Sequence, residues 1–219
     1  MKLGFIGTGN ISSDVITGIC KSKLAVSKIT ISLRNKSKSK NLKKKFKNKI
    51  KIAKNNQEIV NNSEWVFLGI LPEVGEKILP KLKFKSNQTI ISFISTINTD
   101  KLKRITNKRA TIIRAIPMPP ISLGKGPIAL YPPNKKVKNF FNKIGTSIEI
   151  KSEKLSNNFW AISGTMASFY EQLKVLSDWL VKKGLKRSDA QKYVTSLYSA
   201  LAQLAEAHSS KDLKKFVLD

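Results

Sequence analysis

The first residues whose spacing suggests chemistry are two glycines near the N-terminus. Gly7 and Gly9, followed by Ser12, approximate the Gly-x-Gly-x-x-Gly pattern, with serine at the third small position. In a strand–turn–helix setting, the first glycine makes the tight turn and the second lets the backbone approach a pyrophosphate, while the third position needs a small side chain for packing. The helix start offers unpaired N–H groups to an anion. We expect a dinucleotide site here; an ordinary glycine turn is the alternative.

The polar residues after the second expected strand, 28–33, indicate which dinucleotide. They read Arg34, Asn35 and Lys36. An acidic residue at this position would bond the adenosine ribose hydroxyls of NAD. Here two cationic side chains and polar donors can hold a 2′-phosphate, and no carboxylate repels it. We therefore expect NADP as the cofactor, with NADPH preferred over NADH.

Few other residues are candidates for catalysis. A single cysteine, Cys20, and a single histidine, His208, exclude a disulfide framework, a zinc ribbon, an iron–sulfur site and a multi-histidine metal site. We expect Cys20 to be an inert, partly buried thiol and His208 to be a cation favoured by a helix C-terminus. Glu171 and Asp178 share a helix face but lack the setting of a paired-carboxylate site. The catalytic residue stays unassigned, and no metal is expected.

The charge is strongly basic, with 41 Lys and Arg residues against 14 acids, a net charge of +27 and a pI of about 10.2. Such a balance would ordinarily suggest nucleic-acid binding. Only five of the basic residues are arginines, whereas base readout favours arginine forks and aromatic platforms. Lysine, asparagine and isoleucine, abundant throughout, all have A/T-rich codons. We attribute the charge to codon composition and keep nucleic-acid binding as the alternative.

Short apolar segments alternate with helical patterns up to about residue 150. The expected strands are 2–7, 28–33, 50–53, 65–70, 89–94, 111–116, 128–131 and 147–150. This alternation is typical of a parallel sheet with right-handed crossovers, and the apolar run Val66–Ile70 fits a strand buried on both faces. We therefore expect an α/β fold, in which residues 1–151 form a Rossmann-type, doubly wound parallel sheet that binds NADP.

From residue 152 to the end, apolar residues instead recur every three or four positions. They predict one long helix through Leu180 that Gly184 ends, a second helix capped by Ser188, and a third over 211–218. We expect 152–219 to be a small helical domain for dimerisation and substrate binding. It is too short to look self-sufficient, so its apolar stripe should pack on the first domain or on another copy. With no apolar run of about 20 residues and no signal peptide, we expect a cytoplasmic protein without membrane contacts.

Several segments together resemble the pyrroline-5-carboxylate reductase family. Residues 5–12 are similar to its Gly-x-Gly-Asn-Met-Ala opening, and 67–72 to its Phe-Leu-Ala-Val-Lys-Pro strand end. Residues 114–120, followed by two glycines, resemble Arg-x-Met-Pro-Asn-Thr-Pro, and 161–164 resemble the start of Leu-Ser-Gly-Ser-Gly-Pro-Ala-Tyr. Residues 55–58 resemble the segment where the family places an asparagine near the adenosine. The order of the motifs is the same along essentially the whole chain.

The resemblance implies an oxidoreductase of proline biosynthesis, which transfers hydride from NADPH to the C=N carbon of L-1-pyrroline-5-carboxylate and yields L-proline. It also implies a homodimer, or a higher homo-oligomer, through the C-terminal helices. Together with the two motifs above, it gives these expected cofactor contacts: Ile6, Gly7, Thr8, Gly9, Asn10, Ile11, Arg34, Asn35, Lys36, Asn56, Gly69, Ile70, Leu71, Pro72, Phe93, Ile94 and Ser95. The last three would surround the nicotinamide ribose.

The substrate carboxylate would be held at Ser163, Gly164 and Thr165, through N–H groups of a helix start. Close helix packing by small residues is the alternative reading of Ser163 and Gly164.

Departures from the family fall where chemistry is expected. Met118 and Pro119 replace Asn-Thr, Leu71 replaces a lysine, and 165–167 replace Ser-Gly-Pro. The sequence stops at Asp219, before the family's Ser/Thr-Pro-Gly-Gly loop, which supplies substrate-carboxylate contacts and a proposed proton donor. We therefore expect the helical domain to be incomplete. Two alternatives stay open: a related dehydrogenase of another imine or carbonyl compound, and a non-catalytic NADP-binding homologue.

Overall fold

The computed structural model describes residues 1–106 and 110–209, which form two compact units. One unit comprises Met1–Trp160 and the other Ala161–Asp219, so the division falls inside helix α7 (Ser156–Ser163). The roles predicted for residues 1–151 and 152–219 stay predictions. The helix expected over 211–218 lies outside the described residues.

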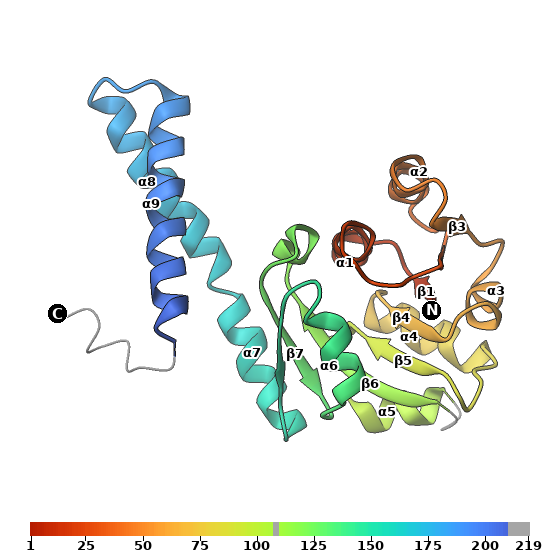
Figure 1. Cartoon of the computed structure of the whole chain (residues 1–219). Coiled ribbons are helices and arrows are strands. Elements are labelled where there is room, and N and C mark those ends of the chain that lie inside the picture. The colour runs from red at the N-terminus through yellow and green to blue at the C-terminus, as the bar shows by residue number, and fades with distance from the viewer. Residues whose placement is uncertain (107–109, 210–219) are drawn as a thin grey trace. The chain divides into compact units, whose positions relative to one another are not determined.

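The first unit is an eight-stranded sheet covered by helices (Figure 1). Its strands are β1 Lys2–Ile6, β2 Lys28–Ile31, β3 Ile50–Ile52, β4 Trp65–Leu68, β5 Thr89–Ser92, β6 Thr111–Pro117, β7 Pro127–Tyr131 and β8 Thr146–Glu149, in the order β3-β2-β1-β4-β5-β6-β7-β8. The helices are α1 Asn10–Lys21, α2 Lys36–Lys45, α3 Asn56–Asn61, α4 Pro72–Ile78, α5 Thr99–Ile105 and α6 Lys135–Phe141, with 3₁₀ turns η1 Leu79–Lys81, η2 Pro119–Leu123 and η3 Glu153–Leu155.

Alternate residues of the central strands are buried in two separate cores. Trp65 and Phe67 of β4 lie in the core that contains residues of α1, α2 and α6, whereas Val66 and Leu68 lie in the core that contains residues of α3, α5 and η1. Because successive side chains of a strand point to opposite faces, helices cover the sheet on both sides. The expected doubly wound α/β fold is confirmed.

One strand direction differs from the expectation. β7 pairs antiparallel with β6, and β8 then pairs parallel with β7. A parallel neighbour needs a crossover of a dozen or more residues, but the link between β6 and β7 runs only from 118 to 126 and contains the single turn η2. The sheet is therefore mostly parallel, not fully parallel.

The order of the strands reverses between β1 and β4, which lie side by side and lead to helices on opposite faces. The backbone pairing continues past the strand ends, since Gly69 N–H donates to the Ile6 carbonyl at 2.9 Å and Phe93 N–H to the Leu68 carbonyl at 2.9 Å. The segments that follow β1, β4 and β5 therefore begin next to one another. In open α/β sheets, ligands bind in the crevice at such a switch point.

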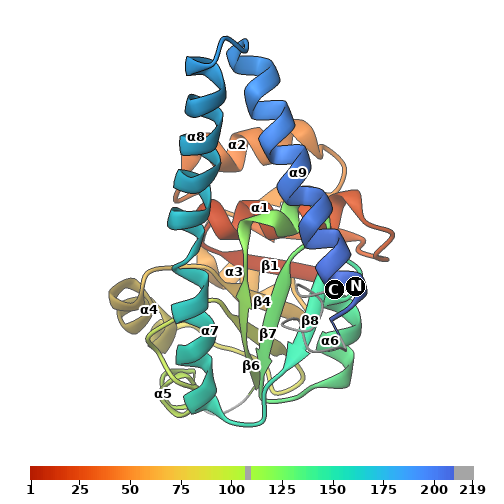
Figure 2. The same cartoon turned by 90° about the vertical axis from the view of Figure 1, so that its left-hand side faces the viewer.

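The second unit contains α8 (Met166–Lys182) and α9 (Arg187–Ala207), which pack side by side (Figure 1, Figure 2). Ala190 and Val194 of α9 are buried, and the rings of Phe169 and Tyr198 meet edge to face at 5.9 Å. Within the described residues, every helix is too short or too polar to cross a membrane.

Two details of the helical pattern were predicted wrongly. The single long helix expected through Leu180 is two helices, because Gly164 and Thr165 interrupt it. Their N–H groups bond three residues back, to Ala161 and Ile162. Ser188 is not a cap, since α9 begins at Arg187 after Lys186. Gly184, with a φ of +101°, does follow the end of α8.

Candidate functional site

The turn between β1 and α1 packs tightly against the turn after β4. Gly7 has a φ of +96°, and a Cβ there would lie 2.2 Å from the Gly69 carbonyl oxygen. A Cβ on Gly69 would lie 1.9 Å from Oγ of Ser12, which is fully buried. Neither glycine can therefore carry a side chain without moving its neighbour. Ser12, at the third small position of the motif, supplies the close packing that the pattern predicts.

The start of α1 has the features of an anion site. Gly9 is the N-cap, and no acidic residue lies in the first helical turn. Among the described residues, the backbone N–H groups of 8–12 have no hydrogen-bond acceptor. A Cβ on Gly9 would meet nothing within 4 Å, so the backbone is open to a ligand at this point. Free N–H groups and the positive end of a helix dipole suit a pyrophosphate.

A buried hydroxyl network joins this turn to the end of β2. Gly7 N–H donates to Ser32 Oγ at 3.0 Å, and Ser39 Oγ donates to the Ser32 carbonyl at 2.8 Å. The Thr8 and Ser39 hydroxyls lie 3.0 Å apart. Thr8, Ser32 and Ser39 are all buried. Ser32 and Ser39 were not predicted as site residues, because their only signal in the sequence was a hydroxyl at an apolar strand end and on a helix face.

The segment that follows Ser32 lines a cleft together with the glycine turn. Asn35 caps α2 by accepting a hydrogen bond from Lys38 N–H at 3.1 Å, and Arg34 is exposed. Among the described residues, the Arg34 guanidinium has no hydrogen-bond or ion-pair partner, so it is available to a ligand. A cleft of about 580 Å³ is lined by Gly7, Thr8, Gly9, Arg34, Asn35, Lys36, Gly69, Ile70 and Leu71. All nine are predicted cofactor contacts.

A smaller cavity of about 200 Å³ shares Arg34 with this cleft and contains Asn56. It is lined by Ile6, Gly7, Ser32, Arg34, Asn56, Ile70, Val74 and Ile78. Asn55 caps α3 by accepting from Glu58 N–H at 2.9 Å, and the Lys51 ammonium lies 2.6 Å from the Glu58 carboxylate. The hydrogen bond from Lys51 lowers the pKa of Glu58. These contacts fix the first turn of α3, and with it Asn56, beside Arg34.

Three other predicted contacts lie at or beside the turns without lining the cleft. Asn10 lies in a groove between α1 and α2, where its Oδ1 contacts the Lys38 ammonium. Ile11 packs against the core, and Pro72 is the first residue of α4. Their assignment to the cofactor stays a prediction.

The residues predicted around the nicotinamide ribose point in different directions. Phe93 is buried, with its ring centroid 5.7 Å from that of Phe67. Ile94 is buried on the other face, where its Cδ1 lies 3.2 Å from the Cβ position of Gly75. At these two positions only the backbone is available to a ligand. Ser95, by contrast, is one of the residues that line a cavity.

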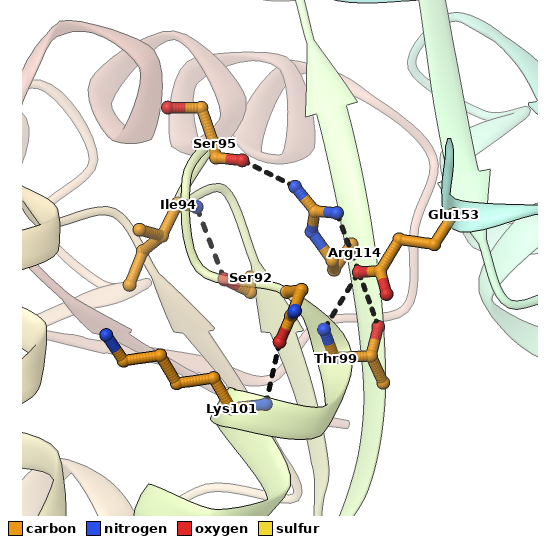
Figure 3. A network of polar contacts seen from close by, with 8 residues as sticks. Ser92, Ile94, Ser95, Thr99, Lys101, Arg114 and Glu153 are labelled. Carbon is orange, nitrogen blue, oxygen red and sulfur yellow. Dashed lines mark hydrogen bonds and ion pairs between the residues drawn. The ribbon is translucent and has the colours of Figure 1, made fainter. Parts of the chain in front are cut away.

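That cavity, of about 640 Å³, lies beyond the end of β5 and is polar. Its lining residues are Ser95, Thr96, Asn98, Arg114, Glu153, Lys154 and Asn157. Figure 3 shows Arg114 between Ser95 and Glu153. The Arg114 guanidinium lies 2.7 Å from a Glu153 carboxylate oxygen and donates to the Ser95 carbonyl at 2.6 Å. Arg114 was predicted only as part of a motif, and Glu153 carries no signal in the sequence that marks it as its partner.

The predicted substrate residues belong to the second unit. Ser163 is the last residue of α7, and Thr165 precedes α8, which begins at Met166. The predicted helix start at Ser163–Gly164 is therefore wrong, because the N–H groups of Gly164 and Thr165 are already bonded. The Thr165 hydroxyl donates to the Ile162 carbonyl at 2.7 Å. A carboxylate site at these three residues stays a prediction.

The fit of NADP can be judged from these residues. Free N–H groups at 8–12 match a pyrophosphate, and the Arg34 guanidinium beside Asn56 matches an adenosine 2′-phosphate. Within residues 1–106 and 110–209, no group of three or more His, Cys, Asp and Glu side chains could hold a metal ion. A doubly wound sheet with this glycine turn at its switch point defines an NADP-binding domain of the oxidoreductase class.

Comparisons with known proteins agree with this class. Residues 2–98 match the family model described as NADP oxidoreductase coenzyme F420-dependent. A pyrroline-5-carboxylate reductase of Synechocystis sp. is 26% identical over 214 residues, which cover 93% of this chain and 79% of that protein. Along most of its length the chain is therefore similar to pyrroline-5-carboxylate reductases.

Solved structures show the same fold along the chain. The 1-pyrroline-5-carboxylate reductase of Streptococcus pyogenes is 25% identical, with a TM-score of 0.80 over 99% of this chain and 83% of that one. The pyrroline carboxylate reductase of Plasmodium falciparum, solved with NADP bound, is 23% identical, with a TM-score of 0.80 over 94% of this chain and 79% of that one.

Proposed function

We propose that this chain is an NADPH-dependent imine reductase that converts L-1-pyrroline-5-carboxylate to L-proline, a step of proline synthesis. The observation that carries the proposal is the cleft at the switch point, which joins the glycine turn to Arg34 and Lys36 with no carboxylate among its lining residues. The similar reductase of Plasmodium falciparum was solved with NADP bound. The nicotinamide of bound NADPH would supply the hydride for a C=N carbon.

The residues of this chain would act mainly by binding and orientation. The N–H groups of 8–12 would hold the pyrophosphate, and Arg34 and Lys36 the adenosine phosphate. The backbone of 93–95, which begins beside the turns after β1 and β4, would support the nicotinamide ribose. Since a protonated imine is already electrophilic, holding the two reactants in attack geometry is the main requirement.

The direct test is turnover by the purified chain. NADPH oxidation followed at 340 nm should depend on added L-1-pyrroline-5-carboxylate, and L-proline should accumulate in the same amount. Absence of oxidation, with NADPH still bound, would contradict the reductase proposal and support a non-catalytic NADP-binding homologue. A Gly9→Trp variant, whose side chain would fill the open cleft, is the matched inactive control.

A second candidate is a reductase of another imine or of a carbonyl compound. Met118, half-buried, and Pro119, exposed, stand where the family has polar residues, and this apolar pair favours a less polar substrate. Turnover of several cyclic imines, with and without a carboxylate, decides between the candidates. A higher kcat/KM for the imine without a carboxylate would favour the second.

We also propose that the chain forms a homodimer through its C-terminal helices. Apolar side chains of α8 and α9 are exposed, among them Trp179 at 56%, Tyr193 at 63% and Leu201 at 53%. Monomeric proteins rarely expose so many large apolar residues on one element pair. Sedimentation equilibrium should give twice the mass of the chain, and Leu201→Glu should lower it. A monomer at micromolar concentration would contradict this proposal.

A further inference from the structure

Arg114 is a buried cation built into the wall of the polar cavity beyond β5. Its side chain is 7% exposed, and one terminal nitrogen lies 2.7 Å from Oε1 of Glu153, which approaches from η3. The other terminal nitrogen donates to the Ser95 carbonyl at 2.6 Å. The remaining nitrogen, Nε, is buried and has no partner. Each terminal nitrogen of the guanidinium thus has a partner within the chain.

Glu153 ties down the far end of the same loop. Its Oε1 also accepts the Thr99 N–H at 2.8 Å and the Thr99 hydroxyl at 2.9 Å, at the first residue of α5 (Figure 3). The loop between β5 and α5 is therefore bonded at Ser95 by Arg114 and at Thr99 by Glu153. Inside the loop, Ile94 N–H donates to Ser92 Oγ at 3.2 Å.

A buried ion pair is weak evidence for stability, because desolvation offsets its attraction. The Arg114–Glu153 pair does fix the path of the backbone between β5 and α5, because it bonds that loop at Ser95 and at Thr99. β5 ends at Ser92, and Phe93 and Ile94 are buried on opposite faces. Arg114 then holds the loop at the Ser95 carbonyl. This bond fixes the direction of the backbone at Ser95, directly after Phe93 and Ile94.

We propose that Arg114 is a positioning residue, which acts with Glu153 to hold the loop that supports the nicotinamide half of the cofactor. This inference rests on the proposed function. The proposal assigns the two arginines to different halves of the cofactor. Arg34 contacts the adenosine half. Arg114 affects only the nicotinamide half, and it does so through Ser95. A merely structural role would weaken both halves together.

The test compares two probes on the full chain. NADPH spans both halves, whereas adenosine 2′,5′-bisphosphate occupies only the adenosine half. For Arg114→Met, which keeps the bulk but removes the donors, we expect NADPH affinity to fall by about tenfold or more, since a hydrogen bond from a charged group is lost. Affinity for adenosine 2′,5′-bisphosphate should change by less than about twofold, because the two sites are separate.

Controls keep the result interpretable. Arg104→Met, on the exposed face of α5, removes the same charge and should change neither affinity. Glu153→Gln keeps an acceptor for Thr99 but not the ion pair, and should reproduce the loss for NADPH in part. If Arg114→Met does not fold, Glu153→Gln and Arg114→Lys carry the same comparison of probes.

Two results would overturn the inference. One is unchanged NADPH affinity in a folded Arg114→Met; the other is an equal loss for both probes, which marks a structural role. Failure of the wild-type chain to bind either probe would contradict the proposed function itself, and this inference with it.

Discussion

Gly7 and Gly69 touch so closely that a Cβ on Gly7 would lie 2.2 Å from the Gly69 carbonyl oxygen. The contact joins the turns that follow β1 and β4, the two strands at which the strand order reverses. It therefore sets the width of the cleft in which we place the cofactor.

Gly7→Ala should weaken both the fold and cofactor binding. The substitution forces a side chain into a left-handed backbone and against the Gly69 carbonyl oxygen, at a cost of about 1–3 kcal/mol. Gly9→Ala is the matched control, because its Cβ meets nothing within 4 Å. It should melt as the wild type does, yet bind NADPH more weakly, since the methyl group occupies the space for the pyrophosphate. Thermal melts and fluorescence titration of both variants check this; equal melting temperatures for the two would contradict it.

Ser39→Ala should destabilise the first unit through the buried hydroxyl network. It removes the bond to the Ser32 carbonyl and one of the two partners of the Thr8 hydroxyl, for a loss of about 1 kcal/mol, or about 2–4 °C in melting temperature. The exposed Ser37→Ala, on the same helix, should have no measurable effect. A double-mutant cycle with Thr8→Val should show coupling, and simple additivity would mean that the two hydroxyls do not interact.

Gly18→Ala should destabilise the protein, although alanine favours helices. Propensity alone predicts a gain of about 1 kcal/mol. However, the new Cβ would lie 2.3 Å from the Ile121 carbonyl of η2, and overpacking costs about 1–3 kcal/mol. Gly75→Ala in α4 would meet only the ends of isoleucine side chains, of which Ile94 Cδ1 is the nearest at 3.2 Å, and should cost less. Denaturant unfolding of both variants measures the difference; a stabilised Gly18→Ala would show that α1 and η2 are not packed this closely.

Cys20 should react slowly with alkylating reagents. Burial raises the pKa of its thiol to about 11, and the positive charge of Lys49 offsets this only in part. The thiolate is the reactive form, so iodoacetamide should modify the folded chain slowly at pH 8 and faster as the pH approaches 11. Because the folded state holds this proton more tightly than the unfolded state, the same group lowers stability as the pH rises between about 9 and 11. Mass spectrometry follows the single cysteine, and a rate at pH 8 equal to that of the urea-denatured chain would contradict burial.

That Gly7, Arg34 and Gly69 line one cleft could be predicted, because each depends on a local pattern. Each apolar segment ends in a recognisable turn, and parallel strands place such turns at one edge of the sheet. Gly7, Arg34 and Gly69 thus come together although they are far apart in the sequence. The strand expected over 65–70 ends at Leu68, because Ile70 packs against the core from the turn without pairing in the sheet. An apolar run in the sequence does not by itself distinguish a residue that pairs in the sheet from one that only packs against the core.

Other features depend on contacts between distant residues and left no local signal. Arg114 and Glu153 pair across 39 positions, and the Ser32–Ser39 network forms only once β2 and α2 are in place. The antiparallel direction of β7 follows from the length of a link whose turn the sequence did not reveal. The break between α7 and α8 at Gly164 also left no signal in the sequence. It involves only two residues, so the spacing of apolar residues by three or four continues across it.

The central claim is that Arg34 and its neighbours recognise the adenosine 2′-phosphate, and one fluorescence titration tests it. The wild-type chain should bind NADPH at least about tenfold more tightly than NADH, as expected for a charge-assisted contact to phosphate. Arg34→Ala should remove most of that difference by weakening NADPH binding while leaving NADH binding unchanged. Equal affinities in the wild type, or an undiminished preference in Arg34→Ala, would contradict the account.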